Sequence, residues 1–340
     1  MPFQNAKVAV AVAAAALGVA SIHACSVPKG PHDSEGRVAY PTPAPLSATI
    51  VTDSAKARET HALQTVWVIA MENHDWSDIA GSASAPYLNG TLLPMAAHAA
   101  RYTSPRGVRP SEPNYIWLEA GDDLQITDND DPTTNYRTTK HHLTGYLNAA
   151  GVTWRSYQES IPSGVCPLVS SGRYGAKHNP MLFFDDVTDG RQSSSQSCIE
   201  HVRPYPEMTA DLTAGKVARY NFITPNMCSD MHDSDAGCET RDSVRNGDLW
   251  LSREVPKILA SKEYQAGGVI FIVWDESEGS ADAPIGLIAI SKHAKPGYMG
   301  HVAYNHSSLL RTVQDVFAVK PYIRDAANAS ALDDLFVTYP

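Results

Sequence analysis

The sequence has no excess of basic residues and no long run of lysine or arginine. Its 340 residues include 27 lysines and arginines against 37 aspartates and glutamates, a formal net charge of −10. Proteins that bind nucleic acids need a basic surface for the phosphate backbone, so the composition argues against nucleic acid as a partner. Disorder and low complexity are excluded too, because 43% of the residues are hydrophobic and can form a core.

The hydrophobic run at the N-terminus is too short to cross a bilayer. Val8–Val19 has 12 residues, whereas a membrane-spanning helix needs about 20. Its length and its position after Lys7 are typical of the central part of a secretory signal. We therefore predict a signal peptide over residues 1–24 and an exported protein that is periplasmic, attached to the cell surface or secreted.

The segment Ile22-His23-Ala24-Cys25 resembles the site at which bacterial lipoproteins are cleaved and lipidated on cysteine. His23 does not fit that pattern, in which small residues are the rule. Cleavage after Ala24 by an ordinary signal peptidase is the alternative. A lipid on Cys25 would be the protein's only predicted contact with a membrane.

One further stretch has the composition of a linker. Residues 25–62 include Pro41, Pro43 and Pro45 and lack hydrophobic periodicity, which is typical of an extended tether. Because no internal repeat or second linker follows, we predict a single domain over residues 63–340.

Cysteine is scarce, and none of its spacings is of the Cys-x-x-Cys kind that is typical of zinc sites. Apart from Cys25, the chain has Cys166, Cys198, Cys228 and Cys238. An even number in an exported protein predicts two disulfides. Three pairings are open, and we favour 166–198 with 228–238 because these close the shortest loops.

Two predicted strands end in polar side chains. Thr65–Met71 leads directly into Glu72, Asn73 and His74, and Gly268–Trp274 leads into Asp275 and Glu276. Continuous apolar runs of this length are typical of strands covered by helices on both faces of an α/β sheet. Ligands of such sheets bind at the carboxyl ends of the strands.

Glu72, Asn73, Asp275 and Glu276 are therefore a candidate metal site. Carboxylates that lie close together repel each other unless a cation neutralises them. A set of oxygen ligands favours one hard divalent ion, Mg²⁺, Ca²⁺ or Mn²⁺, over zinc. The alternative is that these are ordinary polar residues near solvent. The same arrangement at two strands favours the metal site.

A stiff turn carries a candidate nucleophile. In Arg109-Pro-Ser-Glu-Pro-Asn-Tyr115 the two prolines restrict the backbone around Ser111. Helical residues are expected from Tyr115 to Leu118, which places the serine near a helix N-terminus. Such a position favours a phosphate-like anion, and a hydroxyl there could attack it. Pro-Ser-x-Pro alone is more often only a turn.

Two histidines are candidates for proton transfer. His232 follows the predicted strand Tyr220–Ile223 and has Asp230 and Asp233 close by. Nearby carboxylates favour the charged imidazole, which suits phosphate binding or protonation of a leaving group. His306 and the two serines after it lie at the N-terminus of a predicted amphipathic helix. For both, a solvated polar segment is the alternative.

In this order, these segments resemble the phosphoesterase family that contains bacterial acid phosphatases and phospholipases C. The resemblance spans residues 65–318. It is carried by Met71-Glu-Asn-His74, Pro110-Ser-Glu-Pro-Asn-Tyr115, Lys177-His-Asn-Pro180, Asn226-Met-Cys-Ser-Asp-Met-His-Asp233, Gly247-Asp-Leu-Trp250, Trp274-Asp-Glu276 and Asn305-His-Ser-Ser-Leu-Leu-Arg-Thr312.

The resemblance implies an alkaline-phosphatase-like fold, an α/β/α sandwich around a central, mostly parallel sheet. It implies that the four candidate ligands hold one metal ion. Ser111 corresponds to the nucleophile, and Asn114 would lie close to the phosphoryl oxygens.

The resemblance also gives roles to the charged loops. His232 and His306 would face the phosphate or the leaving group, with Asp230 nearby. Lys177 and His178 are weaker candidates for substrate binding, because a Lys-His-Asn-Pro turn could equally be structural. Arg109 stands where relatives often have histidine, and its permanent charge would keep the attraction for phosphate.

We therefore predict an exported, metal-dependent phosphoesterase of acid phosphatase type. It would hydrolyse a small soluble phosphomonoester through a phosphoseryl intermediate on Ser111. A phospholipase C or another phosphodiesterase is the second interpretation. It ranks second because phospholipases C of the family carry added C-terminal β domains, whereas this chain ends at Pro340. A non-catalytic exported binding protein on the same fold is the third. It would have lost the nucleophile or a metal ligand, and the sequence keeps both.

Overall fold

The structure is a computed structural model that describes residues 61–279 and 283–340. The predicted signal peptide, Cys25 and nearly all of the predicted tether lie outside the described residues. Among the described helices, none has both the length and the hydrophobicity to span a bilayer.

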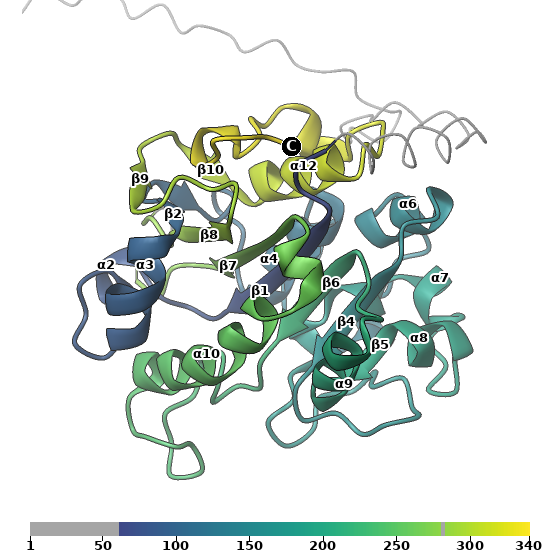
Figure 1. The fold of residues 1–340 in the computed structure, drawn as a ribbon. Helices are drawn as coiled ribbons and strands as arrows, with labels where there is room; N and C mark the ends of the chain where they lie inside the picture. The colour runs from purple at the N-terminus through teal and green to yellow at the C-terminus, as the bar shows by residue number, and fades with distance from the viewer. Residues whose placement is uncertain (1–60, 280–282) are drawn as a thin grey trace, which may run out of the picture. The chain divides into compact units, whose positions relative to one another are not determined.

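An eight-stranded sheet with the order β5-β4-β6-β1-β7-β8-β2-β9 lies at the centre (Figure 1). The five strands from β5 to β7 are parallel, β8 is antiparallel to both β7 and β2, and β9 is parallel to β2. Strands β3 and β10 form a separate parallel pair. The strands are β1 (Thr65–Met71), β2 (Ala97–Ala99), β3 (Tyr102–Thr103), β4 (Trp154–Gln158), β5 (Val202–Pro204), β6 (Tyr220–Thr224), β7 (Gly268–Trp274), β8 (Leu287–Ser291), β9 (Tyr298–Gly300) and β10 (Tyr304–Asn305).

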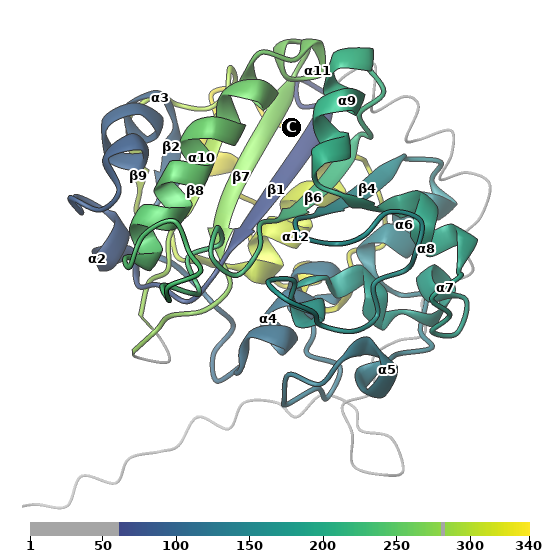
Figure 2. The same ribbon diagram turned by 90° about the horizontal axis from the view of Figure 1, so that it is seen from below.

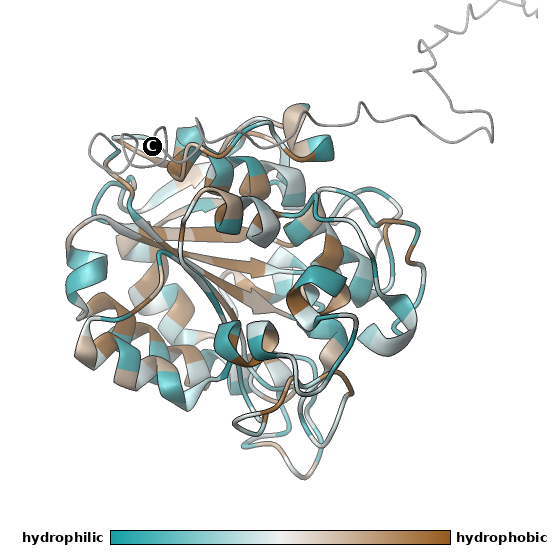
Figure 3. Cartoon of the chain, turned by 90° about the vertical axis from the view of Figure 1, so that its right-hand side faces the viewer, coloured by the Kyte–Doolittle hydropathy of each residue, from teal (hydrophilic) through white to brown (hydrophobic). Residues whose placement is uncertain are grey.

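The two predicted strands are found with the predicted bounds and are neighbours in the centre of the sheet. Every residue of β1 and of β7 is buried, and Figure 3 shows the hydrophobic sheet between helices of mixed polarity. The burial of both faces explains why neither strand alternates between apolar and polar residues.

Helices cover both faces of the sheet. In Figure 2, α9 and α10 lie in front of it and α12 lies behind it. The α-helices are α2 (Trp76–Ile79), α3 (Leu93–Met95), α4 (Ser111–Ala120), α5 (Pro132–Asn135), α6 (Leu143–Ala149), α7 (Asp185–Thr188), α8 (Gln196–His201), α9 (Pro206–Ala214), α10 (Ser243–Leu259), α11 (Lys262–Gln265) and α12 (His306–Val316). Shorter helical turns are the π-helical Leu88–Leu92 and the 3₁₀ turns Ala176–His178, Pro180–Phe183, Arg324–Ala327 and Asp333–Leu335.

Helix α4 begins earlier than the sequence pattern indicates, whereas helix α12 begins where it is expected. Helix α4 starts at Ser111, four residues before Tyr115, because Pro113 lies in the first turn, where a missing N–H costs no helical hydrogen bond. Helix α12 starts at His306, where the side chain of Asn305 accepts a hydrogen bond from the backbone N–H of Ser308. Both candidate side chains therefore lie at helix N-termini.

The favoured disulfide pairing is confirmed. Cys166 is bonded to Cys198, and Cys228 to Cys238. The second bridge closes the loop that carries Asp230 and His232.

Candidate active site

The carboxyl ends of β1 and β7 bring the predicted metal ligands together. Met71 pairs with Trp274 in the register of the two strands, so Glu72 and Asp275 leave the sheet side by side. The backbone N–H of Glu72 donates to the carbonyl oxygen of Asp230 at 2.8 Å. Acidic groups from three distant parts of the sequence therefore meet at one edge of the sheet.

Oxygen atoms of four of these residues lie close together around Ser111. Its hydroxyl donates to Glu72 Oε2 at 3.1 Å and lies 3.5 Å from Glu276 Oε1. One end of the Asn73 amide lies 3.2 Å from Asp275 Oδ1 and 3.3 Å from Glu276 Oε1. If this end is the amide nitrogen, it can donate a hydrogen bond to both carboxylates. If it is the amide oxygen, three oxygen-bearing groups face one another and need a cation between them.

Several buried polar atoms at this point have no hydrogen-bond partner among the described residues. Buried polar atoms normally have one, so a concentration of unpartnered atoms indicates a place for a ligand. The donor set is dominated by carboxylate oxygen, which fits a hard divalent cation. The atoms are Asn114 Oδ1, Asp275 Oδ2 and three that meet a partner only in an ion pair with His178, namely Glu72 Oε1, Asp230 Oδ2 and His178 Nε2 itself.

Burial and mutual repulsion favour the protonated form of these carboxyl groups when no cation is bound. Burial, followed by the charge of Asp230, raises the pKa of Glu72 from 4.5 to about 8. Burial and then the charges of Glu72 and Glu276 hold the pKa of Asp275 well above its usual range. A cation that binds here must displace protons, because both compete for the same oxygens.

His178 lies among the carboxyl groups. Its Nε2 is 3.2 Å from Glu72 Oε1 and its Nδ1 is 3.5 Å from Asp230 Oδ2. The ring stacks on Tyr115, with the centroids 5.0 Å apart, and burial holds the pKa of His178 well below its usual value. The neighbouring Lys177 is half-buried, and its charge lowers the pKa of Glu72 and Asp230.

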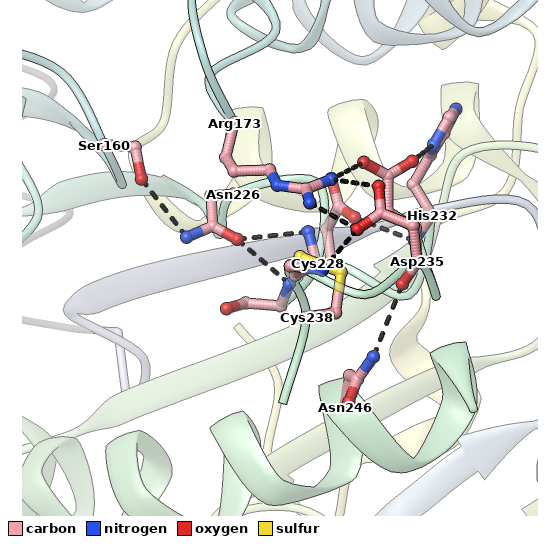
Figure 4. Close-up of polar contacts among 12 residues, drawn as sticks. Ser160, Arg173, Asn226, Cys228, His232, Asp235, Cys238 and Asn246 are labelled. Carbon is pink, nitrogen blue, oxygen red and sulfur yellow. Dashed lines mark hydrogen bonds and ion pairs between the residues drawn. A yellow bond between two sulfur atoms is a disulfide. The ribbon is translucent and has the colours of Figure 1, made fainter. Parts of the chain in front are cut away.

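His232 lies at the rim, in the loop closed by the Cys228–Cys238 bridge (Figure 4). Its backbone N–H donates to Asp230 Oδ1 at 2.9 Å, and its Nδ1 is 2.8 Å from an oxygen of Asp233. The side chain is 31% exposed, and its ring lies 6.1 Å from that of His178. This position leaves the imidazole accessible to a substrate.

Ion pairs and amide contacts hold this loop in place. Arg173 donates to Asp233 at 2.5 Å and to both oxygens of Asp235 at 2.9 and 2.5 Å (Figure 4). The side chain of Asn226 accepts from the backbone N–H of Cys228 at 3.1 Å. The loop that presents His232 is therefore fixed by contacts independent of the carboxylate cluster.

The turn before Ser111 is braced by its own residues. The amide nitrogen of Asn114 donates to the carbonyl oxygens of Val108 and Pro110, both at 3.1 Å. Arg109 Nε lies 3.7 Å from Glu276 Oε2, and the same guanidinium donates to the carbonyl oxygen of Ser277 at 2.6 Å. Its positive charge is thus next to the cluster, as the sequence predicts.

His306 has protein partners on both ring nitrogens. Nε2 lies 2.7 Å from the carbonyl oxygen of Asp275, and Nδ1 lies 3.0 Å from the hydroxyl of Tyr102. A carbonyl oxygen only accepts, so Nε2 carries the proton and Nδ1 accepts from the tyrosine. Burial lowers the pKa of His306 to about 4. This geometry favours a positioning role at the end of β7 over proton transfer to a substrate.

Sequence reasoning missed the aromatic residues that hold the two buried histidines. Tyr115 lies four residues after Ser111 on α4, so helical periodicity could have placed it on the face of the nucleophile. No local pattern links Tyr102 to His306, because β3 is only two residues long.

Residues 96–320 match the sequence profile of the Phosphoesterase family. A phosphatidylinositol-3-phosphatase of Mycobacterium tuberculosis is 27% identical over 271 residues, which are 80% of this chain and 82% of that protein. A probable acid phosphatase of Kluyveromyces lactis is 24% identical over 277 residues, 77% of this chain and 61% of that protein. An acid phosphatase of Aspergillus fumigatus is 26% identical over 220 residues, 62% of this chain. The chain thus spans less than two thirds of these two fungal relatives, 61% and 43% of their lengths.

Solved structures of low sequence identity share the fold. A protein of the alkaline phosphatase superfamily from Vibrio parahaemolyticus has a TM-score of 0.52 at 11% identity, covering 85% of this chain and 80% of its own. A phosphonate monoester hydrolase from Silicibacter pomeroyi has a TM-score of 0.51 at 11% identity, covering 82% of this chain and 77% of its own. The predicted alkaline-phosphatase-like sandwich with a mostly parallel sheet is confirmed.

Proposed function

The chain belongs to the Phosphoesterase family and is a hydrolase of phosphoester bonds, and from this premise we propose that it is a metal-dependent phosphatase with Ser111 as its nucleophile. The observation that carries the proposal is the position of the serine hydroxyl, 3.1 Å from Glu72 Oε2 and 3.5 Å from Glu276 Oε1. It lies at the first residue of a 10-residue helix, whose free N–H groups favour an anion.

One divalent cation completes the site, held by Glu72, Asn73, Asp275 and Glu276. The buried Oδ2 of Asp275, which has no hydrogen-bond partner among the described residues, supports this assignment. When bound, such an ion supplies Lewis acidity to the phosphoryl group and to the attacking hydroxyl. Oxygen ligands favour Mg²⁺, Ca²⁺ or Mn²⁺.

The side chains of this chain move the protons. Ser111 Oγ attacks phosphorus, the phosphorus–oxygen bond to the leaving group breaks, and the hydroxyl proton passes to Glu72 Oε2. His232, exposed at the rim, gives a proton to the departing alkoxide. A water molecule then attacks the phosphoserine and gives a proton to His232, the bond from phosphorus to Ser111 Oγ breaks, and the proton on Glu72 returns to Ser111 as inorganic phosphate forms.

Five other residues attract the substrate or hold the site in place. Arg109 and Lys177 bring positive charge to the phosphate oxygens, while His178 holds the carboxyl groups of Glu72 and Asp230. His306 fixes the backbone at Asp275. Asn114 braces the turn. It is also the remaining candidate for contact with a phosphoryl oxygen of the substrate.

The proposed substrate is a small phosphomonoester outside the cytoplasm. Two disulfides support export, because such bridges persist in oxidising compartments. A phosphomonoester carried by a lipid headgroup is a second candidate, since one relative is named for a phosphoinositide. A phosphodiesterase of phospholipase C type remains the alternative for the reaction.

The test is hydrolysis of p-nitrophenyl phosphate and p-nitrophenyl phosphorylcholine by the purified protein, with and without chelator. We expect cleavage of the first, lost with chelator and restored by Mg²⁺, Ca²⁺ or Mn²⁺. Preferential cleavage of the second compound would favour the phosphodiesterase. Cleavage of neither would favour the non-catalytic binding protein.

Variants then test the nucleophile. Ser111→Ala should lower turnover about 1,000-fold or more. Ser252→Ala is the matched control, because that hydroxyl only donates to Leu249 within α10. Full turnover in Ser111→Ala would show that another group attacks phosphorus.

A further inference from the structure

A second group of metal-binding side chains lies beside the candidate active site. His74, Asp78 and Glu278 each offer one ligand atom, and these atoms all lie within 4.8 Å of one another. His74 is buried, whereas Asp78, in the short helix α2, and Glu278 are exposed. None of the three belongs to the predicted catalytic metal set.

The histidine distinguishes this group from an ordinary acidic surface cluster. The side chain of His74 is only 8% exposed and its Nδ1 lies 3.5 Å from Glu278 Oε2. This buried nitrogen has no hydrogen-bond partner among the described residues. The other ring nitrogen, Nε2, lies 3.2 Å from the hydroxyl of Ser243. Histidines that bind metals have this arrangement, with one nitrogen free for the metal and the other held by a hydrogen bond.

The charge around these side chains is negative among the described residues. Two carboxylates and a neutral imidazole carry two negative charges, which one divalent cation neutralises. Asp75 and Asp242 add to the negative charge nearby: Asp75 Oδ1 is buried without a hydrogen-bond partner, and Asp242 acts on His74 through its charge. Arg245 is already 3.6 Å from Asp248 in an ion pair.

We propose that His74, Asp78 and Glu278 form a second divalent cation site that binds a transition metal such as Zn²⁺. One imidazole nitrogen with two carboxylate oxygens suits zinc, whereas Mg²⁺ and Ca²⁺ prefer oxygen alone. Ligand atoms around a tetrahedral zinc lie about 3.3 Å apart, close to the 3.5 Å between His74 and Glu278. The exposed side chain of Asp78 can rotate to close the remaining gap.

The proposed site connects the segments that carry the catalytic residues. His74 follows Glu72 and Asn73 after β1, and Glu278 follows Asp275 and Glu276 after β7. A metal held by both segments ties them together outside the sheet. It therefore stabilises the active-site edge without contacting the substrate.

Calorimetric titration with Zn²⁺ tests the proposal. The titration uses the full-length protein with the substitution Asp275→Asn, which disables the predicted catalytic metal set. We expect one zinc ion to bind and Mg²⁺ to bind at least tenfold more weakly. Glu278→Gln and Asp78→Asn, added singly, should each lower the zinc affinity about 10- to 100-fold. Both residues are exposed, so folding should survive, and the circular dichroism spectrum checks it.

Glu200→Gln is the matched control, because Glu200 is an exposed carboxylate on α8 that accepts only from Gln196 among its hydrogen bonds here. It should leave zinc binding unchanged. The proposal is wrong if the Asp275→Asn protein binds no zinc, if Mg²⁺ binds equally well, or if Glu278→Gln binds zinc as tightly as its parent. The readout is binding alone, so failure of the proposed phosphatase mechanism would leave the result interpretable.

Discussion

At the scale of single residues, the partners of a buried histidine indicate what it can do. His178 points both ring nitrogens at carboxyl groups of the candidate active site. His306 instead points Nε2 at the carbonyl oxygen of Asp275, the residue at which β7 meets the site. A ring that holds this backbone fixes the direction of the Asp275 side chain, and so it acts on catalysis through another residue.

His306→Gln should therefore weaken metal binding rather than remove a proton donor. We expect the concentration of Mg²⁺ or Mn²⁺ needed for half-maximal activity to rise about 10- to 100-fold. The pH profile of kcat at saturating metal should keep its shape. Tyr102→Phe keeps the imidazole and loses only the hydrogen bond to Nδ1, so a smaller effect is expected. An unchanged metal requirement with a lost limb of the pH profile would restore the proton-transfer role.

Much of the candidate site could be predicted from sequence because its acidic residues directly follow recognisable strands. Glu72 and Asp275 directly follow apolar runs, and parallel strands end at one edge of a sheet. The position of His178 among the carboxyl groups could not be predicted in the same way. It lies in a 3₁₀ turn of three residues, and only packing against Tyr115 brings it among the carboxyl groups.

At the scale of elements, a buried charged group joins three helices behind the site. His142, which caps α6, lies 2.9 Å from Glu119 of α4 and 3.0 Å from Asp186 of α7. Its ring is fully buried and stacks on Phe184 at 3.9 Å. Its two carboxylate partners raise the pKa of His142 against the opposing effect of burial, and the histidine lowers that of Asp186.

The stability that this group provides should depend on pH in a defined window. The raised pKa of His142 gives stability that is complete below pH 6.5 and is lost as pH rises through the folded-state value. The lowered pKa of Asp186 gives stability that is complete above pH 3.8 and is lost in acid. The contribution is therefore largest between these two values.

His142→Gln should lower the free energy of unfolding near pH 5 by about 3–5 kcal/mol, because it leaves a buried carboxylate without its partner. Urea titrations at pH 5 and pH 8 measure the effect, which should be smaller at pH 8. His141→Gln is the control, since the adjacent ring lies against Tyr146 outside this group. Equal losses at both pH values would mean that the histidine contributes only by packing.

The two disulfides should differ in their effect on catalysis. Replacing Cys228 and Cys238 with serine opens the loop that carries Asp230 and His232, at a cost of about 3 kcal/mol. We expect kcat to fall well beyond what the loss of folded protein explains. The Cys166 and Cys198 pair, 32 residues apart, is the control, with a similar loss of stability and nearly full kcat per folded molecule. If the variant without the Cys228–Cys238 bridge keeps as much kcat per folded molecule as this control, the loop is held by Arg173 and its acidic partners instead.

Element boundaries were predictable where burial leaves a strong pattern. The bounds of β1 and β7 follow from their apolar composition alone. The edge strands β2 and β9 have three residues each, too few for a period to be recognised. The sequence pattern predicts a late start for helix α4 because Pro113 is typical of a turn, although proline is also compatible with a first helical turn.

At the scale of the whole molecule, the buried carboxyl groups link metal binding to stability. Without a cation, burial raises the pKa of Glu72 to about 8, so the folded protein holds this proton more tightly than the unfolded chain does. The resulting stability is complete below pH 4.5 and is lost as pH rises through 8. Asp230 and Asp275, whose pKa values burial also raises, act in the same direction.

Chelator should therefore destabilise the protein more at pH 8 than at pH 5. Magnesium at 100 times its dissociation constant should add about 2.7 kcal/mol, which corresponds to a rise in Tm of about 5 °C. Thermal melts at both pH values, with Mg²⁺ or with chelator, measure this. Magnesium is chosen because the proposed zinc site should bind it at least tenfold more weakly than zinc.

Glu72→Gln separates the two effects, because the neutral amide removes one buried charge as well as one metal ligand. In chelator at pH 8 this variant should melt above the wild type, since it no longer loses the stability of a proton on Glu72. It should gain little from Mg²⁺ and have almost no phosphatase activity. If wild type and variant respond equally to Mg²⁺, the cation binds elsewhere, and the carboxyl cluster around Ser111 is not the catalytic metal site.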